Sequence, residues 1–159
     1  MCAPQAPAHG ASDDLRISPY WQTKLRELTR PAAVSLVPSL STENALCYQN
    51  KKKDSGSLVA FADQEKEKRP DHILLIRVGE FYEAFGLDAL MLVQHAGLNP
   101  MGKRCRAGCP ISNLQATLDD LTAAGLTVAV YEEVAPANTG TGTFKKLKQR
   151  ALAQVCACV

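Results

Sequence analysis

The sequence predicts an α/β domain in which helices flank a mixed β-sheet, and three observations lead to this fold class. Two short apolar runs rich in β-branched residues, at 72–78 and 126–134, are typical of buried strands. Two segments with helical apolar spacing, at 87–97 and 112–125, lie between them. The chain has 159 residues, which is enough for one core of helices packed on a sheet.

The N-terminal part is predicted to contain one short helix. Residues 1–18 are rich in Pro, Ala and Ser, a composition typical of disorder. In the following YWQTKLREL, the residues Trp21, Leu25 and Leu28 recur at helical spacing. Pro31 is expected to end this helix, because proline lacks the amide that a helix interior needs.

The segment from residue 38 to residue 70 is polar, with a lysine triplet and the run DQEKEKRP. It is predicted to be a linker or a variable insertion, in which Leu58–Phe61 could form a short strand. The predicted organisation is therefore a disordered tail at 1–18, a helix with its polar linker at 19–70, and a core at 71–159.

The first core helix is predicted to follow the strand at 72–78. Gly97 is suited to end it, because glycine readily adopts the left-handed conformation found after helices. Its apolar positions are Leu87, Leu90, Met91 and Val93. A loop or short strand that contains Pro100, Gly102 and Gly108 is expected next.

The second core helix has the clearest boundary signals. Ser112 and Gln115 fit the S-x-x-Q pattern of a capping box, in which each side chain satisfies an exposed backbone amide. Gly125 is suited to close the helix. The apolar face is formed by Leu114, Leu118 and Leu121.

The C-terminal part begins with the predicted strand at 126–134, whose Val128 and Val130 share one side. The Thr-Gly repeat at 139–143 predicts a flexible loop. The tail at 144–159 begins basic and ends apolar, and it is predicted to form a helix followed by a strand.

Composition excludes several classes of protein. The formal net charge of +2 at pH 7 does not by itself identify a nucleic-acid partner. No run of 18 apolar residues is present, so no transmembrane helix is predicted. The first residues lack the basic and apolar regions of a secretory signal, so we expect an intracellular protein. The six cysteines, with C-x3-C and C-x-C spacings unlike usual zinc sites, are interpreted as reduced thiols.

Three blocks of the chain resemble domain I of the MutS family of DNA mismatch repair proteins. They are LLIRVGEFYEAFGLDA, RAGCPISNLQATLDDL and GLTVAVYEEV, and they occur in the family's order within residues 73–134. The stretches HAGLNP, RAGCP and LDDLT resemble the plant-organelle branch more than the bacterial one. This resemblance implies a mitochondrial or plastid location, although no clear transit peptide is present.

The resemblance implies a DNA site at the F-Y-E motif. Phe81 is expected to stack on a mispaired base from the minor groove, and Glu83 to hydrogen-bond it. The Glu83 carboxyl would do so either protonated, toward a base nitrogen, or ionised, toward a base N–H. If the motif is extended, Phe81 and Glu83 lie on one face, and Tyr82 points the other way into the core.

Basic residues are expected to supply phosphate contacts that do not depend on base sequence. The candidates are Lys103, Arg104, Arg106, Lys145, Lys146 and Lys148. The expected partner is double-stranded DNA with mismatches or small loops, with no membrane involved. Full-length members of the family are dimeric ATPases that use ATP and magnesium, whereas this domain alone is expected to be a monomer without a cofactor, metal site or catalytic residue.

Two alternatives remain open. The first is a protein-interaction module that has the MutS fold but no longer binds DNA, which a buried Phe81 would favour. The second is a small nucleotide-binding enzyme built on the G-x-x-x-x-G-K stretch from Gly97 to Lys103. That stretch lacks the context of a P-loop, because a helix is predicted before it and Arg104 follows the lysine where Ser or Thr is needed.

Overall fold

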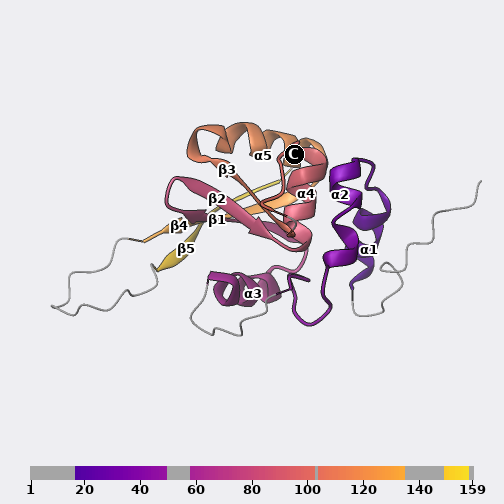
Figure 1. Cartoon of the computed structure of the whole chain (residues 1–159). Helices are drawn as coiled ribbons and strands as arrows, with labels where there is room; N and C mark the ends of the chain where they lie inside the picture. Colours follow the sequence, from indigo (N-terminus) through magenta and orange to yellow (C-terminus); the bar gives the residue numbers. More distant parts are fainter. Residues whose placement is uncertain (1–16, 50–57, 103, 135–148, 158–159) are drawn as a thin grey trace, which may run out of the picture.

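A five-stranded mixed sheet forms the centre of the structure, a computed structural model that describes residues 17–49, 58–102, 104–134 and 149–157. The strand order is β3-β2-β1-β4-β5, and only β1 and β4 pair in parallel (Figure 1). The predicted class, α/β with a mixed sheet, is therefore confirmed. The strands are β1 His72–Val78, β2 Phe81–Phe85, β3 Arg106–Pro110, β4 Thr127–Glu133 and β5 Arg150–Cys156.

Helices cover both faces of this sheet. Helices α4 and α5 pack against each other and against the strands, α3 lies across the sheet from α5, and α1 and α2 lie beside α4 (Figure 1). The helices are α1 Pro19–Arg26, α2 Pro31–Val34, α3 Leu58–Lys68, α4 Leu87–His95 and α5 Leu114–Ala123, with 3-10 turns η1 Val37–Ser39 and η2 Ile111–Asn113.

The two parallel strands β1 and β4 are the centre of the core. Four consecutive residues of β1, from Ile73 to Ile76, are buried, so both faces of the strand are covered. In β4, Val128 and Val130 fill one face while Ala129 and Tyr131 fill the other. Each large apolar side chain buried in this way contributes about 1.5–3 kcal/mol, which explains why continuous apolar runs predicted these strands correctly.

Strand register decides which side chains share a face. Ile76 pairs with both Tyr131 and Glu83, so Glu83 and Phe81 lie on the Tyr131 face. Helix α3 covers the β4 part of that face, where the Phe61 and Tyr131 rings meet edge to face at 5.7 Å. The β2–β3 part of the same face carries the Phe81 ring outward.

The predictions for the N-terminal part are partly wrong. Helix α1 is confirmed, but it ends at Arg26, and Pro31 begins α2, where a first-turn proline costs no hydrogen bond. Leu58–Phe61 is the first turn of α3 rather than a strand, and most of the predicted linker beyond it is helical. This helix is anchored by Lys66, whose ammonium is 2.6 Å from the buried Asp88 carboxylate.

The predicted capping box is also wrong. Ser112 lies inside η2, and α5 begins after Asn113 with no side-chain cap bond. Gln115 instead donates to Asp119 at 2.8 Å along the exposed side of the helix. The predicted ends of the two core helices are confirmed, because Gly97 and Gly125 have φ of +66° and +79° just beyond α4 and α5.

The expected segment with Gly108 forms strand β3, and the expected C-terminal strand is β5. The predicted disorder at 1–18 is wrong for its last two residues, since Ile17 is buried and the Ser18 side chain caps α1. The rest of that tail, the flexible loop at 139–143 and the helix predicted from residue 144 lie outside the described residues. In the part of the chain that the structure describes, no helix combines the length and apolar character needed to cross a bilayer.

Candidate nucleic-acid interface

Phe81 stands at the tip of the β1–β2 hairpin. Val78 pairs with Phe81, so only Gly79 and Glu80 form the turn. Gly79 has φ of +62°, and a glycine at the first central position is typical of a type II′ hairpin turn. A Cβ at Gly79 would meet no atom within 4 Å, so backbone conformation rather than space requires the glycine there.

The Phe81 ring is exposed to solvent. Its relative exposure is 45%, and among the described residues it is the one aromatic side chain in the exposed large apolar set. Large aromatic rings are usually buried, because leaving their apolar surface in water costs free energy. The neighbouring Tyr82 is buried on the opposite face, as the alternation of an extended strand predicts.

Glu83 is present on the Phe81 face as predicted, but it is neither exposed nor unpaired. Its relative exposure is 6%, and its Oε2 accepts hydrogen bonds from Arg106 Nε at 2.9 Å and Nη2 at 2.5 Å. Gly108 lies directly opposite on β3, and a Cβ there would be 3.1 Å from Glu83 Cγ. Because glycine has no side chain, Gly108 leaves room for the side chain of Glu83.

Arg106 links this carboxylate to the rest of the face. Its guanidinium lies 5.4 Å from the centre of the Phe85 ring, and 36% of its side chain is exposed. Sequence reasoning proposed Arg106 for phosphate contact but missed its pairing with Glu83. No sequence signal reveals that pair, since it depends on the register between β2 and β3.

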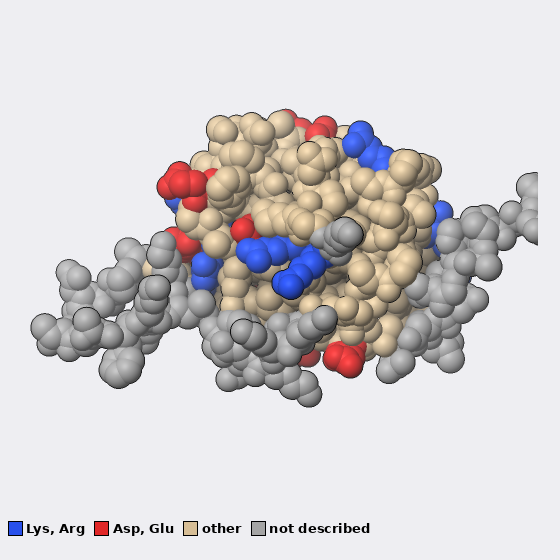
Figure 2. Space-filling view, viewed as in Figure 1, with Lys and Arg blue, Asp and Glu red and all other residues tan. Residues whose placement is uncertain are grey.

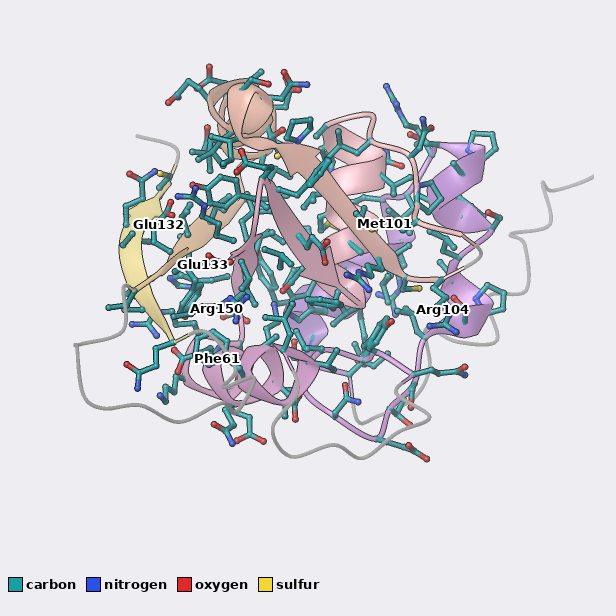
Figure 3. The ribbon with its side chains drawn as sticks, turned by 60° about the vertical axis from the view of Figure 1, so that its left-hand side comes forward. Phe61, Met101, Arg104, Glu132, Glu133 and Arg150 are labelled. Carbon is teal, nitrogen blue, oxygen red and sulfur yellow. The ribbon has the colours of Figure 1, made fainter. Side chains whose placement is uncertain are left out.

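The predicted phosphate-binding residues are only partly within the described structure. Arg104 is exposed next to β3, and Figure 3 places it near Met101, away from Glu132 and Glu133. Figure 2 shows Lys and Arg side chains grouped near the centre of one face, surrounded mainly by uncharged residues. Lys103, Lys145, Lys146 and Lys148 lie outside the described residues.

Glu132, near the end of β4, stabilises the β1–β2 hairpin through hydrogen bonds on the face opposite Phe81. The hydroxyl of Tyr82 donates to Glu132 Oε1, and Glu132 Oε2 is 3.1 Å from Arg77 Nη1. Burial, and then the hydrogen bond to Glu132, raises the pKa of Tyr82 to about 12. Tyr82 therefore stays protonated at neutral pH and can donate, which fixes the back of the strand that carries Phe81.

The following residue, Glu133, holds the turn itself. Its Oε1 accepts from the Gly79 amide at 2.9 Å and lies 3.6 Å from Arg150 Nη2. Arg150 Nε also donates to the Arg77 carbonyl at 2.8 Å, which ties the start of β5 to the hairpin. Figure 3 shows Glu132, Glu133 and Arg150 gathered at this edge of the sheet.

The nucleotide-binding alternative does not fit the observed context. The stretch from Gly97 to Gly102 follows helix α4 and leads to strand β3, whereas a P-loop connects a strand to a following helix. Among the described residues, no group of three or more His, Cys, Asp or Glu side chains is placed to bind a metal ion.

The thiols of Cys105 and Cys109 are buried, and burial raises the pKa of both.

The fold and this hairpin define an α/β domain that presents one aromatic ring beside an ion-paired carboxylate. The family description "MutS domain I" matches residues 57–157, a range that includes α3 and every strand of the described sheet. The chain therefore belongs to the MutS family, as its three sequence blocks indicated.

Similar proteins include both organelle and bacterial members of the family. The chain is 41% identical over 143 residues to the mitochondrial DNA mismatch repair protein MSH1 of Arabidopsis thaliana, covering 82% of this chain and 13% of that protein. It is 42% identical over 72 residues to MutS of Chlamydia pneumoniae, covering 44% of this chain and 9% of that protein. It is 34% identical over 87 residues to MutS of Thermus thermophilus, covering 51% of this chain and 11% of that protein. The chain thus spans a small part of these relatives.

Proposed function

We propose that this chain recognises mismatched DNA by inserting the Phe81 ring into the base stack from the minor groove. The observation that carries the proposal is the exposure of this ring at the tip of a tight hairpin, within a MutS domain I. If the ring were buried in the core, no part of it could reach a base. Its exposure therefore favours DNA binding over the protein-interaction alternative.

The chemistry of the ring suits a search for weak points rather than for a base sequence. Unstacking at a mispaired step costs less than at an intact step, so an apolar wedge enters there preferentially. A phenyl ring stacks on any base, with a contribution of about 1–3 kcal/mol, and carries no hydrogen-bonding group that would favour one base. Selectivity then comes from local deformability of the duplex.

The hairpin is built to hold this wedge in place. Its turn is fixed by the Gly79 amide bonded to Glu133, and its buried face is fixed by Tyr82 bonded to Glu132. A ring on such a support loses little conformational freedom when it stacks, so less free energy is spent on ordering. This rigidity favours insertion of the ring over its collapse onto the protein surface.

Phosphate contacts supply the remaining affinity. Arg106 lies on the Phe81 face and Arg104 is exposed two residues before it. Further phosphate contacts are proposed for Lys103, Lys145, Lys146 and Lys148. These contacts do not depend on sequence and weaken as salt rises, because binding releases counterions from the DNA. The isolated chain is proposed to bind duplexes weakly, as a monomer, without catalysis or a cofactor.

A location in mitochondria or plastids is proposed from the similarity to a mitochondrial protein. The ATP-dependent steps of mismatch repair are assigned to the rest of a full-length protein rather than to this chain. Nucleotide binding by the chain that is lost in Lys103→Ala would favour the enzyme alternative instead.

The test is a salt titration of binding to a matched duplex and to the same duplex with one mismatch. Fluorescence anisotropy of labelled DNA is measured for the wild type, for Phe81→Ala and for Val155→Ala. Val155 is a matched control, since it is an apolar residue with 48% exposure on β5. We expect Phe81→Ala to remove the preference for the mismatch and to keep most of the salt-dependent binding, while Val155→Ala changes neither. A mismatch preference that survives in Phe81→Ala would overturn the wedge mechanism.

A further inference from the structure

We propose that Arg106 exchanges its bond to Glu83 for a DNA phosphate, so that Glu83 becomes available to a base only when the duplex is bound. This inference rests on the proposed function and assigns a specificity-determining role to Arg106. Glu83 is expected to contact a base, yet its carboxylate is already bound to Arg106 and the residue is only 6% exposed.

The geometry of the pair makes such an exchange possible. Both hydrogen bonds from Arg106 go to a single carboxylate oxygen, Oε2 of Glu83, through Nε at 2.9 Å and Nη2 at 2.5 Å. The guanidinium has five N–H donors, so others remain to engage a phosphate. The exposures of the two side chains differ, with 36% for Arg106 and 8% for Glu83, so it is the arginine that DNA reaches first.

A phosphate is a suitable replacement for the carboxylate. Arginine binds both groups through charge-assisted hydrogen bonds of similar geometry. A move toward solvent therefore leaves Arg106 paired. In the observed position, Cζ of Arg106 lies 5.4 Å from the centre of the Phe85 ring.

The exchange would add to discrimination between matched and mismatched DNA. On an intact duplex, Glu83 loses Arg106 and faces the groove with no new donor, which opposes binding. At a mismatch, an unpaired base N–H replaces the lost bond. Binding is then favoured only where Phe81 has opened the stack, so the wedge and the carboxylate select for the same defect.

The test is a double-mutant cycle on binding to the matched duplex, with Glu83→Gln, Arg106→Gln and both changes together in the full chain. Glu83→Gln is expected to bind the matched duplex about tenfold more tightly, because Arg106 is released from a charged partner. Arg106→Gln is expected to lower the slope of log affinity against log salt by about one phosphate contact. In the Arg106→Gln background, Glu83→Gln should then have little effect.

Arg104→Gln is the matched control, since it removes an exposed positive charge two residues before Arg106. The effect of Glu83→Gln should persist in that background. If Glu83→Gln raises the affinity for matched DNA equally in the wild type, in Arg106→Gln and in Arg104→Gln, Glu83 merely repels phosphates. The exchange is then refuted. Because this readout uses matched DNA, it is separate from the loss of mismatch preference that tests Phe81. A chain with no salt-dependent binding to either duplex would refute both proposals.

Discussion

The hydroxyl of Tyr82 donates a hydrogen bond to the carboxylate of Glu132, a residue 50 positions later in the chain. Tyr82 follows Phe81 directly, and the two side chains lie on opposite faces of β2. The bond therefore fixes the buried side of the strand whose other side presents the exposed ring. Burial and Glu132 together raise the pKa of Tyr82 to about 12.

Glu132→Gln should lower the pKa of Tyr82 toward its ordinary value, because the amide accepts a hydrogen bond but carries no charge to oppose the phenolate. Glu132→Ala should in addition destabilise the fold by about 1–3 kcal/mol, since it leaves a buried hydroxyl without this acceptor. Phenolate absorbance during alkaline titration and urea unfolding measure the two effects. Glu133→Gln is the control, because the Glu133 side chain accepts from the Gly79 amide and, by strand alternation, lies on the other face of β4 from Glu132. Equal pKa values of Tyr82 in Glu132→Gln and the wild type would contradict this account.

The stability of the fold should fall at alkaline pH. The pKa of both Tyr82 and Tyr131 is raised to about 12 by burial and neighbouring carboxylates, above the value of about 10 in an unfolded chain. Below about pH 10 both states keep these protons, so the stabilisation is fully present. Between about pH 10 and 12 the unfolded chain loses protons that the folded chain retains, and stability decreases. Urea midpoints across this range should fall less steeply in Tyr82→Phe than in the wild type; an equal fall would rule out Tyr82 as a contributor.

The N-terminal helices should depend on one buried ion pair. Lys66 Nζ lies 2.6 Å from Asp88, 2.5 Å from the His72 carbonyl oxygen and 4.4 Å from the centre of the Trp21 ring. Lys66→Met should cost about 3–5 kcal/mol, because it leaves a buried carboxylate without its partner. Adding Asp88→Asn should recover part of this loss.

Urea unfolding of the single and double variants measures this coupling. Lys68→Met is the control, because Lys68 is 63% exposed and pairs with Glu65 at the surface, where an ion pair contributes little. A Lys66→Met chain as stable as the Lys68→Met chain would show that the buried pair does not hold α3 in place.

The same pair explains why α3 was not predicted. Its sequence reads as polar because the residue that anchors it is a lysine, whose partner Asp88 comes 22 residues later. By contrast, β1, α4, α5 and β4 were predicted correctly, since apolar periodicity reports burial directly. Local pattern therefore predicted these four elements, whose burial is apolar, and failed for α3, whose anchor is an ion pair.

The candidate site was also predictable only where local sequence determines it. The opposite directions of Phe81 and Tyr82 follow from strand alternation, which needs only neighbouring residues. The Arg106–Glu83 and Tyr82–Glu132 pairs depend on strand register across long connections, which no spacing in the sequence encodes. Sequence reasoning thus identified the aromatic residue that the structure exposes, Phe81, but not the residues that pair with its neighbours.

Gly108 should be intolerant of any side chain, and this can be tested with the smallest one. A Cβ there would lie 2.7 Å from the Tyr82 carbonyl oxygen, 3.1 Å from Glu83 Cγ and 3.2 Å from Met101 Cε. The first contact is with backbone, so Gly108→Ala must move β2 and β3 apart or displace Glu83. We expect a destabilisation of about 1–3 kcal/mol from this overpacking and a weaker Arg106–Glu83 pair.

Gly102→Ala is the comparison for this substitution, because a Cβ there meets nothing within 4 Å and only the φ of +65° opposes it. Urea unfolding should show a larger loss for Gly108→Ala than for Gly102→Ala. If the Glu83 side chain is displaced, Gly108→Ala should also bind matched DNA more tightly than the wild type, as is expected of Glu83→Gln. A Gly108→Ala chain with unchanged stability and unchanged binding would mean that Gly108 does not provide the space that Glu83 occupies, since a methyl group would then fit between the two strands.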